Sequence, residues 1–258
     1  MAEERRFALK LEYDGTAYGG SQFQLNAKTV QEELEKALEP LAGRPQRAAL
    51  AGRTDAGVHA MGQVAAVAAP ARWTPADLQR ALNARLPGDI SVVAAMMVSA
   101  GFDPRRCAIG RRYQYRILNA AIRSPLARRT VWYMPHHLDI AAMQRSASLL
   151  VGEHDFAAFA GRIDAGLSTV RTMTRADVER DGGIVTLEFE ANAFLPHQVR
   201  RTVGALVETG RGRISEEGFA ALLRQARPGA AGPAAPPQGL SLVEVAYESV
   251  RFEMGENG

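Results

Sequence analysis

The first hundred residues show apolar patterns that predict strands and helices in turn. Residues 6–13, RFALKLEY, place apolar side chains at every second position, which is the period of a half-buried strand, and run into the turn pair Asp14-Gly15. Residues 29–43 have Thr29 and Glu32 at capping-box spacing. Their apolar stripe consists of Val30, Leu34, Leu38 and Leu41. This spacing is typical of a capped amphipathic helix.

The rest of this half completes a recognisable order of elements. Short strands are predicted over residues 47–51 and 62–69, followed by a helix capped by Thr74 that stops at Pro87-Gly88. Residues 90–98, ISVVAAMMV, read as the next strand. The resulting order, β-α-β-β-α-β, is the split βαβ pattern of ferredoxin-like domains.

The second half loosely repeats this order of strands and helices, without a repeat in the amino-acid sequence itself. Strands are predicted over 111–118 and 240–250, with a hairpin over 170–192 that turns at residues 181–183. Helices are predicted from an Asp139 cap to near Gly152, over 196–210 and over 215–226, and the Ala/Pro/Gly-rich residues 228–239 read as a loop. The pattern therefore predicts an α+β protein of two ferredoxin-like halves, residues 1–103 and 104–258. Their sheets are expected to join into a mainly antiparallel sheet with a central cleft.

Composition narrows the function only slightly. The chain has 258 residues, and 31 Lys and Arg against 28 Asp and Glu give a net charge of +3, which fits a local nucleic-acid patch or a neutral-surfaced enzyme equally well. The single cysteine, Cys107, excludes an internal disulfide and a thiolate zinc cluster. The charged start MAEERRFALK has no secretory apolar region, and no apolar run is long enough to span a membrane. We therefore expect a cytoplasmic protein.

The stretch AGRTDAGVHA, residues 51–60, places an arginine and a carboxylate between glycines. Residues two apart share a side of an extended backbone, so Arg53 and Asp55 are expected to share a face, and Gly52 and Gly57 permit tight turning. A structural turn, a metal site and a catalytic carboxylate are the three interpretations. A metal site needs more ligands than Asp55 and His59 provide locally, and the arginine would repel a cation.

Three further features bear on chemistry. In RRYQYRIL, alternation places Tyr113 and Tyr115 on one face, as core residues or as a base-stacking tyrosine beside arginines. In PHQVRRTVG, Arg200 lies near the boundary of a helix face with Arg201 more exposed, and either a phosphate or Asp55 would suit Arg200 as a partner. The acid-His-acid run GEHDF at 152–156 suggests a cap or a solvated turn. Motifs of acyl transfer, nucleotide hydrolysis and hydride transfer do not occur.

Several motifs in collinear order resemble the TruA family of tRNA pseudouridine synthases. These motifs are YDGTAYGG at 13–20, TVQEELEKAL at 29–38, GRTDAGVH at 52–59, LNARLPGDI at 82–90, RRYQYRI at 111–117, LLVGEHDFAAF at 149–159, ANAFLPHQVRRTVGAL at 191–206 and GLSLVEVAY at 239–247. The resemblance covers nearly the whole chain and is far more specific than any one motif.

The resemblance implies a cofactor-free, metal-free conversion of uridine to pseudouridine at positions 38, 39 and 40 of the tRNA anticodon arm, by a homodimer. Asp55 matches the catalytic aspartate, and Arg200 matches the arginine that pairs with it. Tyr113 matches the tyrosine that stacks on the target base. Arg53 matches an arginine that helps hold the base out of its stem. An ionised Asp55 is compatible with attack on the sugar, attack on the base or removal of a sugar proton.

The chain also departs from the family pattern. Ser21 replaces a tryptophan, Gln198 replaces a methionine after Pro196, Arg201 stands where asparagine is frequent, and Ser241 lies in the last strand motif. These departures motivate an alternative, a non-catalytic tRNA-binding protein or chaperone on the same fold. A metal-dependent hydrolase built on Asp55, His59 and the GEHDF acids is a third hypothesis.

Overall fold

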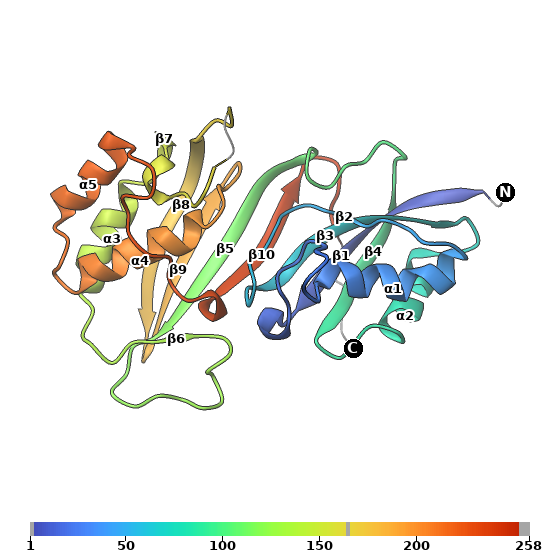
Figure 1. The fold of residues 1–258 in the computed structure, drawn as a ribbon, viewed down its shortest axis with the longest axis horizontal. Coiled ribbons are helices and arrows are strands. Elements are labelled where there is room, and N and C mark those ends of the chain that lie inside the picture. Colours follow the sequence, from blue (N-terminus) through green and yellow to red (C-terminus); the bar gives the residue numbers. More distant parts are fainter. Residues whose placement is uncertain (1–2, 164–165, 253–258) are drawn as a thin grey trace. The chain divides into compact units, whose positions relative to one another are not determined.

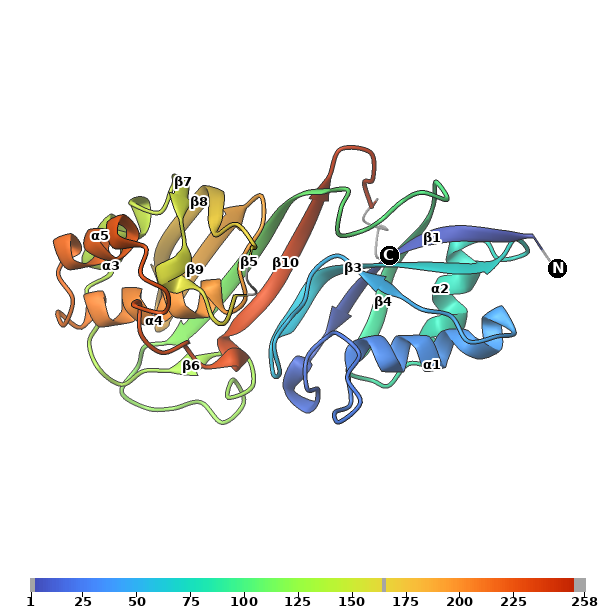
Figure 2. The same cartoon turned by 45° about the horizontal axis from the view of Figure 1, so that its top comes forward.

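The computed structural model describes residues 3–163 and 166–252. These residues form two compact units, one reaching to Ile109 and including the segment from Leu242 onward, the other spanning Gly110–Ser241 (Figures 1 and 2). The predicted halves placed the boundary at residues 103 and 104 and assigned the last strand to the second half. The compact units differ from them because the last strand returns to the first unit.

The first unit is a sheet covered by two helices. Its strands are β1 (Glu4–Tyr13), β2 (Ala49–Leu50), β3 (His59–Pro70), β4 (Ile90–Val98) and β10 (Leu240–Tyr247). The order is β4-β1-β3-β10, with β2 also paired to β3. Within it, the pairs β1–β3, β1–β4 and β2–β3 are antiparallel. The β-α-β-β-α-β order predicted for this half is therefore confirmed.

Helices α1 (Val30–Ala42) and α2 (Pro75–Asn83) begin where the sequence predicts. The Thr29 hydroxyl accepts a hydrogen bond from the backbone N–H of Glu32, and Thr74 does the same for Asp77, both at 3.2 Å. The buried residues of α1 include the whole predicted stripe, which packs against the sheet. These caps satisfy N–H groups that a helix start would otherwise leave without partners.

The second unit has the same kind of build. Its strands are β5 (Ala108–Leu118), β6 (Trp132–Tyr133), β7 (Gly152–Asp155), β8 (Val170–Asp181) and β9 (Ile184–Ala191). The order β5-β9-β8-β7 is antiparallel throughout, while β6 pairs with β5 in parallel. Helices α3 (Ile140–Ser148), α4 (Gln198–Gly210) and α5 (Glu216–Gln225) pack on one another, and α3 contacts β8 (Figure 1). The mainly antiparallel α+β class is confirmed.

One element of this unit was predicted wrongly. The helix expected from Asp139 to near Gly152 ends at Ser148, and Gly152–Asp155 form strand β7 against β8. The Asp139 cap itself is confirmed, because its carboxylate accepts from the N–H of Ala142 at 2.9 Å. Gly152 has φ +113°, a backbone conformation that interrupts a helix and suits glycine.

Short 3-10 turns complete the described elements. They are η1 (Gly15–Ala17), η2 (Ala157–Phe159) and η3 (Pro237–Gly239). Within residues 3–163 and 166–252, no helix combines the length and the apolar character needed to cross a membrane.

Candidate active site

Asp55 lies on the loop between β2 and β3. Thr54 is buried, whereas its neighbours Arg53 and Asp55 are exposed and partly exposed, as expected for residues that alternate across an extended backbone. The Asp55 carbonyl accepts from the N–H of Val58 at 3.1 Å, and Gly57 adopts φ +77°. The loop thus turns back sharply after Asp55.

Thr54 anchors this loop to the first unit. Its side-chain oxygen lies 2.8 Å from the Tyr13 hydroxyl, its N–H donates to Ser21 Oγ at 2.9 Å, and its carbonyl accepts from the N–H of Ser21 at 3.0 Å. Ser21 is fully buried. Burial raises the pKa of Tyr13, and its bond to Thr54 opposes that shift to a smaller extent. These hydrogen bonds therefore fix both the backbone and the side chain of Thr54, the residue next to Asp55.

Two glycines allow the loop around residues 14–22 to approach the Asp55 loop closely. A Cβ on Gly20, where φ is +114°, would lie 2.8 Å from the Thr54 carbonyl oxygen. A Cβ on Gly15 would lie only 1.9 Å from the carbonyl oxygen of Val58. The YDGTAYGG motif therefore supplies glycines where two backbones touch.

Buried side chains hold the two ends of the loop. The Gln63 amide donates to the Gly52 carbonyl at 2.8 Å and accepts from the Gly52 N–H at 3.2 Å. At the other end, His59 Nδ1 accepts from the Gly15 N–H at 3.1 Å and lies 3.2 Å from an oxygen of Asp14. Both Gln63 and His59 are buried. His59 thus has a structural position in the loop frame.

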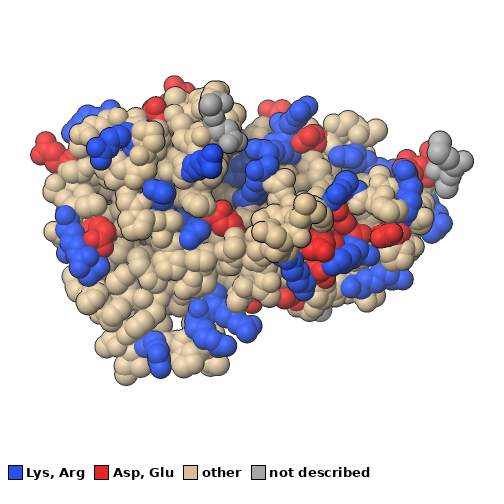
Figure 3. All heavy atoms as spheres, in the orientation of Figure 1, with Lys and Arg blue, Asp and Glu red and all other residues tan. Residues whose placement is uncertain are grey.

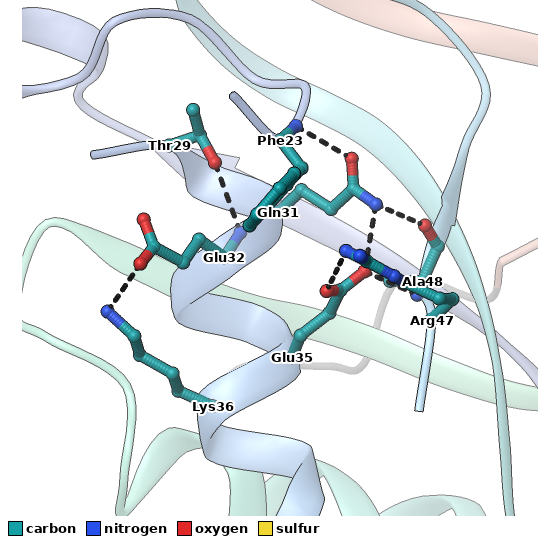
Figure 4. Close-up of polar contacts among 8 residues, drawn as sticks. All are labelled: Phe23, Thr29, Gln31, Glu32, Glu35, Lys36, Arg47 and Ala48. Carbon is teal, nitrogen blue, oxygen red and sulfur yellow. Dashed lines mark hydrogen bonds and ion pairs between the residues drawn. The ribbon is translucent and has the colours of Figure 1, made fainter. Parts of the chain in front are cut away.

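The start of α1 braces the chain that leads into this loop (Figure 4). Gln31 accepts from the Phe23 N–H at 2.9 Å and donates to Glu35 and to the Ala48 carbonyl. Glu35 in turn accepts from the Ala48 N–H at 3.0 Å and pairs with Arg47 at 2.9 Å. The helix therefore positions residues 47 and 48, immediately before β2.

Tyr113 lies on β5 of the second unit. It is 8 % exposed and contacts Phe194 edge-to-face, with ring centroids 5.1 Å apart. Tyr115, two residues on, is fully buried, whereas Arg112 and Gln114 are partly exposed and Arg116 is exposed. The predicted alternation of this strand is confirmed, with both tyrosines on one face.

Arg200 lies in the first turn of α4, beside the same strand. Its Nε donates to the Ala235 carbonyl at 2.8 Å, and its own carbonyl accepts from the Ala235 N–H at 2.9 Å. The Tyr115 hydroxyl donates to the next carbonyl, that of Pro236, at 2.7 Å. Burial raises the pKa of Tyr115, and the positive charge of Arg200 lowers it by a smaller amount. Arg200 and Tyr115 therefore both hydrogen-bond to the backbone of residues 235–236.

Arg201 is less exposed than the sequence suggests. It is partly buried and donates to the carbonyls of Gly229 and Gly232, at 3.3 and 2.9 Å. A Cβ on Gly204 would lie 2.6 Å from the Pro233 carbonyl oxygen, so the helix needs glycine there. We call residues 229–236 the α4 strap, because Arg200, Arg201 and Gly204 of α4 all contact this segment.

The GEHDF run has a structural role in the described chain. Asp155 accepts from the Ala157 N–H at 2.9 Å, which caps η2, in agreement with the predicted capping role. Across residues 3–163 and 166–252, three or more His, Cys, Asp or Glu side chains do not gather anywhere in a group suited to a metal ion.

Comparison with known proteins gives the family. The family model described as tRNA pseudouridine synthase matches residues 10–105 and 146–248. The chain belongs to the tRNA pseudouridine synthase family. Curated relatives named tRNA pseudouridine synthase A include those of Acidiphilium cryptum, 46 % identical over 95 % of this chain and 97 % of the relative, and of Methylobacterium nodulans, 44 % identical over 94 % and 96 %. The predicted family and enzyme class, an isomerase, are confirmed.

The predicted site residues of this synthase fall into two groups. Arg53 and Asp55 share one loop of the first unit, and Tyr113 and Arg200 lie in the second unit, where both are near Tyr115. The pairing of Arg200 with Asp55 stays a prediction. The sequence did not reveal the residues that frame the Asp55 loop, above all Ser21 and Gln63. Both side chains are buried and hydrogen-bonded to residues at least ten positions away in the sequence, so no local pattern predicts their role.

Proposed function

We propose that this synthase converts uridine to pseudouridine at positions 38, 39 and 40 of the tRNA anticodon arm, with Asp55 as the nucleophile. One observation carries the proposal: the residue before Asp55 is fixed by buried hydrogen bonds, while Asp55 itself stays partly exposed. A carboxylate held in this way is oriented before the substrate binds, which lowers the cost of reaching a reactive geometry.

The chemistry needs a group that retains the sugar and the base while their bond is exchanged. C1′ of the ribose gives up its bond to N1 of uracil and forms one to C5, C5 loses a proton, and N1 gains one. An ionised carboxylate can attack the sugar or the base, or remove a sugar proton, and each route avoids release to water. Oxidation and reduction are not involved, so the proposal includes no cofactor.

The remaining site residues have distinct proposed roles. Tyr113 stacks on the target base and assists removal of its C5 proton, Arg53 holds the base out of the stem, and Arg200 pairs with the Asp55 carboxylate and keeps it ionised. The half formed by residues 1–103 supplies the nucleophile, and the half formed by residues 104–258 completes the site. A homodimer in the cytoplasm is the proposed working form.

The decisive experiment is incubation of the purified protein with an unmodified tRNA transcript in EDTA, followed by mapping of pseudouridine. We expect product at positions 38–40 with and without the chelator. Asp55→Asn is expected to lower the rate constant at saturating tRNA by at least about 10³-fold, with tRNA affinity within about threefold, because the amide keeps the shape and loses the nucleophile.

The matched control is Asp181→Asn, an exposed aspartate at the end of β8, which should retain full turnover. Turnover retained by Asp55→Asn would refute its role as nucleophile. Binding without product from the unmodified chain would instead indicate the non-catalytic tRNA-binding alternative. Hydrolysis of the transcript that stops in EDTA, without pseudouridine, would indicate the metal-dependent hydrolase.

A further inference from the structure

The loop of residues 119–131, between β5 and β6, has an unusual charge pattern. It belongs to a stretch of 35 residues, 104–138, that contains eight arginines and no Asp or Glu. Three of these arginines lie in the loop itself, Arg123, Arg128 and Arg129, and all three are exposed. In Figure 3, Lys and Arg atoms gather where Figure 1 draws this loop.

The same loop exposes large apolar side chains. Leu126, which lies between Arg123 and Arg128, is 96 % exposed, and Ile122, which immediately precedes Arg123, is 82 % exposed. A water-facing leucine is common by itself, but two nearly fully exposed aliphatic side chains among three arginines form a surface of mixed character. Such a surface suits RNA, in which charged phosphates alternate with apolar faces of sugars and bases.

The loop is held firmly at its base. The Asn119 N–H donates to the Gly183 carbonyl at 2.8 Å, and its side-chain amide donates to the carbonyls of Met134 and His136. Its side-chain oxygen accepts from Arg180 at 2.5 Å. The Tyr133 hydroxyl donates to the Ala121 carbonyl at 2.9 Å. These bonds to both ends fix the direction in which the loop leaves the sheet, so less entropy is lost when it binds a ligand.

We propose that residues 119–131 form an RNA-binding arm, in which Arg123, Arg128 and Arg129 contact phosphates of the tRNA and Ile122 and Leu126 contact its sugars or bases. The inference rests on the proposed function for its ligand, the tRNA, and adds a contact surface distinct from the proposed site residues Arg53, Asp55, Tyr113 and Arg200. Hairpin residues Glu179 and Asp181 near its base are acidic, so the RNA would approach the tip.

The test compares binding of an unmodified tRNA transcript at several salt concentrations. The variant Arg123→Gln/Arg128→Gln/Arg129→Gln is expected to bind at least about tenfold more weakly near 0.15 M salt. Its slope of log affinity against log salt should be smaller by about 2 to 3, since each lost phosphate contact removes about 0.7 to 0.9. The rate constant at saturating protein should stay within about twofold of the unmodified chain, because the arm does not touch the reacting atoms.

A matched control removes the same charge elsewhere in the same unit. Arg145, Arg213 and Arg224 are exposed on or beside the helices, and Arg145→Gln/Arg213→Gln/Arg224→Gln should leave affinity and slope almost unchanged. A second variant, Ile122→Ser/Leu126→Ser, is expected to lower affinity about two- to tenfold with an unaltered slope, because apolar contacts release no counterions.

Each outcome decides the proposal. Equal losses in the arm and control variants, or an unchanged slope in the arm variant, would overturn it. So would a change in the sedimentation of the free protein together with the loss of binding, because that result would mark the arm as a contact between copies of the chain. If the unmodified chain binds tRNA but forms no pseudouridine, the proposed function fails, whereas the salt slopes still decide whether the arm binds RNA.

Discussion

The side chains of Thr54 and Ser21 fix the Asp55 loop by direct hydrogen bonds. The Ser21 hydroxyl oxygen accepts from the backbone N–H of Thr54, and the backbone N–H of Ser21 donates to the Thr54 carbonyl. The resemblance to the synthase family predicts a tryptophan at this position. An indole has a single N–H donor and offers no oxygen to accept that bond. The resemblance described in the sequence analysis marked position 21 as a departure, but only the packing shows that the serine is part of the frame around Asp55.

Replacing this hydroxyl should therefore weaken both stability and catalysis. Ser21→Ala leaves the buried N–H of Thr54 without its acceptor, which costs about 1–3 kcal/mol in the free energy of unfolding. The loop should shift by enough to lower the rate constant at saturating tRNA about tenfold or more. Urea denaturation and single-turnover kinetics measure the two effects.

The control is Ser91→Ala, at an exposed position of β4, where both quantities should stay within experimental error. Full activity in Ser21→Ala would mean that Tyr13 and the backbone bond hold the loop by themselves.

At the scale of elements, the sequence predicted what local chemistry determines. The capped helices α1 and α2 and the alternating strand β5 follow from side-chain spacing and capping residues that act within a few positions. Strands β6 and β7 were not predicted, because they have two and four residues and exist through pairing with β5 and β8. Such short strands carry too few residues for a period to appear.

The α4 strap leads to a prediction about one glycine. Gly204→Ala would bring a Cβ within 2.6 Å of the Pro233 carbonyl oxygen, so the strap must move away from α4. A clash with backbone places the overpacking cost near the upper end of its range, about 2–3 kcal/mol, and the gain in helix propensity is about 1 kcal/mol, so we expect a net loss of about 1–2 kcal/mol in the free energy of unfolding. Because Arg200 is bonded to Ala235, turnover should also fall.

Thermal denaturation and pseudouridine formation measure these changes. Gly88→Ala is the control, since a Cβ there meets no atom within 4 Å, and it should change stability by less than about 0.5 kcal/mol. A Gly204→Ala protein of raised stability and full activity would contradict the role of the strap.

Across the whole chain, the order of strands and helices could be predicted from the sequence. The assignment of the last residues to the first compact unit could not. Two halves of β-α-β-β-α-β order, the second only loosely, could be predicted from periodicity, since each strand and helix carries its own pattern. The return of residues from Leu242 to the first unit depends on contacts such as the close approach of Gly62 to Val243, where a Cβ would lie 2.3 Å from the carbonyl oxygen. Glycine in a strand permits this contact, but its partner lies 181 positions away in the sequence.

Buried tyrosines in both units are expected to make the folded protein less stable as the pH rises above 10. Burial raises the pKa of Tyr13 in the first unit and of Tyr115 in the second, so both stay neutral in the folded protein above pH 10. In the unfolded chain a tyrosine ionises near pH 10. The folded state then binds more protons than the unfolded state, so the free energy of unfolding should fall as the pH rises above 10, by at most about 1.4 kcal/mol per pH unit for each tyrosine. Below pH 10 this contribution is fully retained.

Tyr115→Phe isolates the contribution of the second unit. Trp132 lies beside Tyr115, with ring centroids 6.3 Å apart, and in a Trp73→Phe background its fluorescence reports unfolding there. At pH 7 the variant should lose about 1 kcal/mol, the value of the bond to the Pro236 carbonyl. Between pH 10 and 11.5 its stability should decline less steeply than that of the parent, by at most about 1.4 kcal/mol per pH unit. Equal slopes in urea titrations of the two proteins would show that Tyr115 ionises in the folded state as readily as in the unfolded chain.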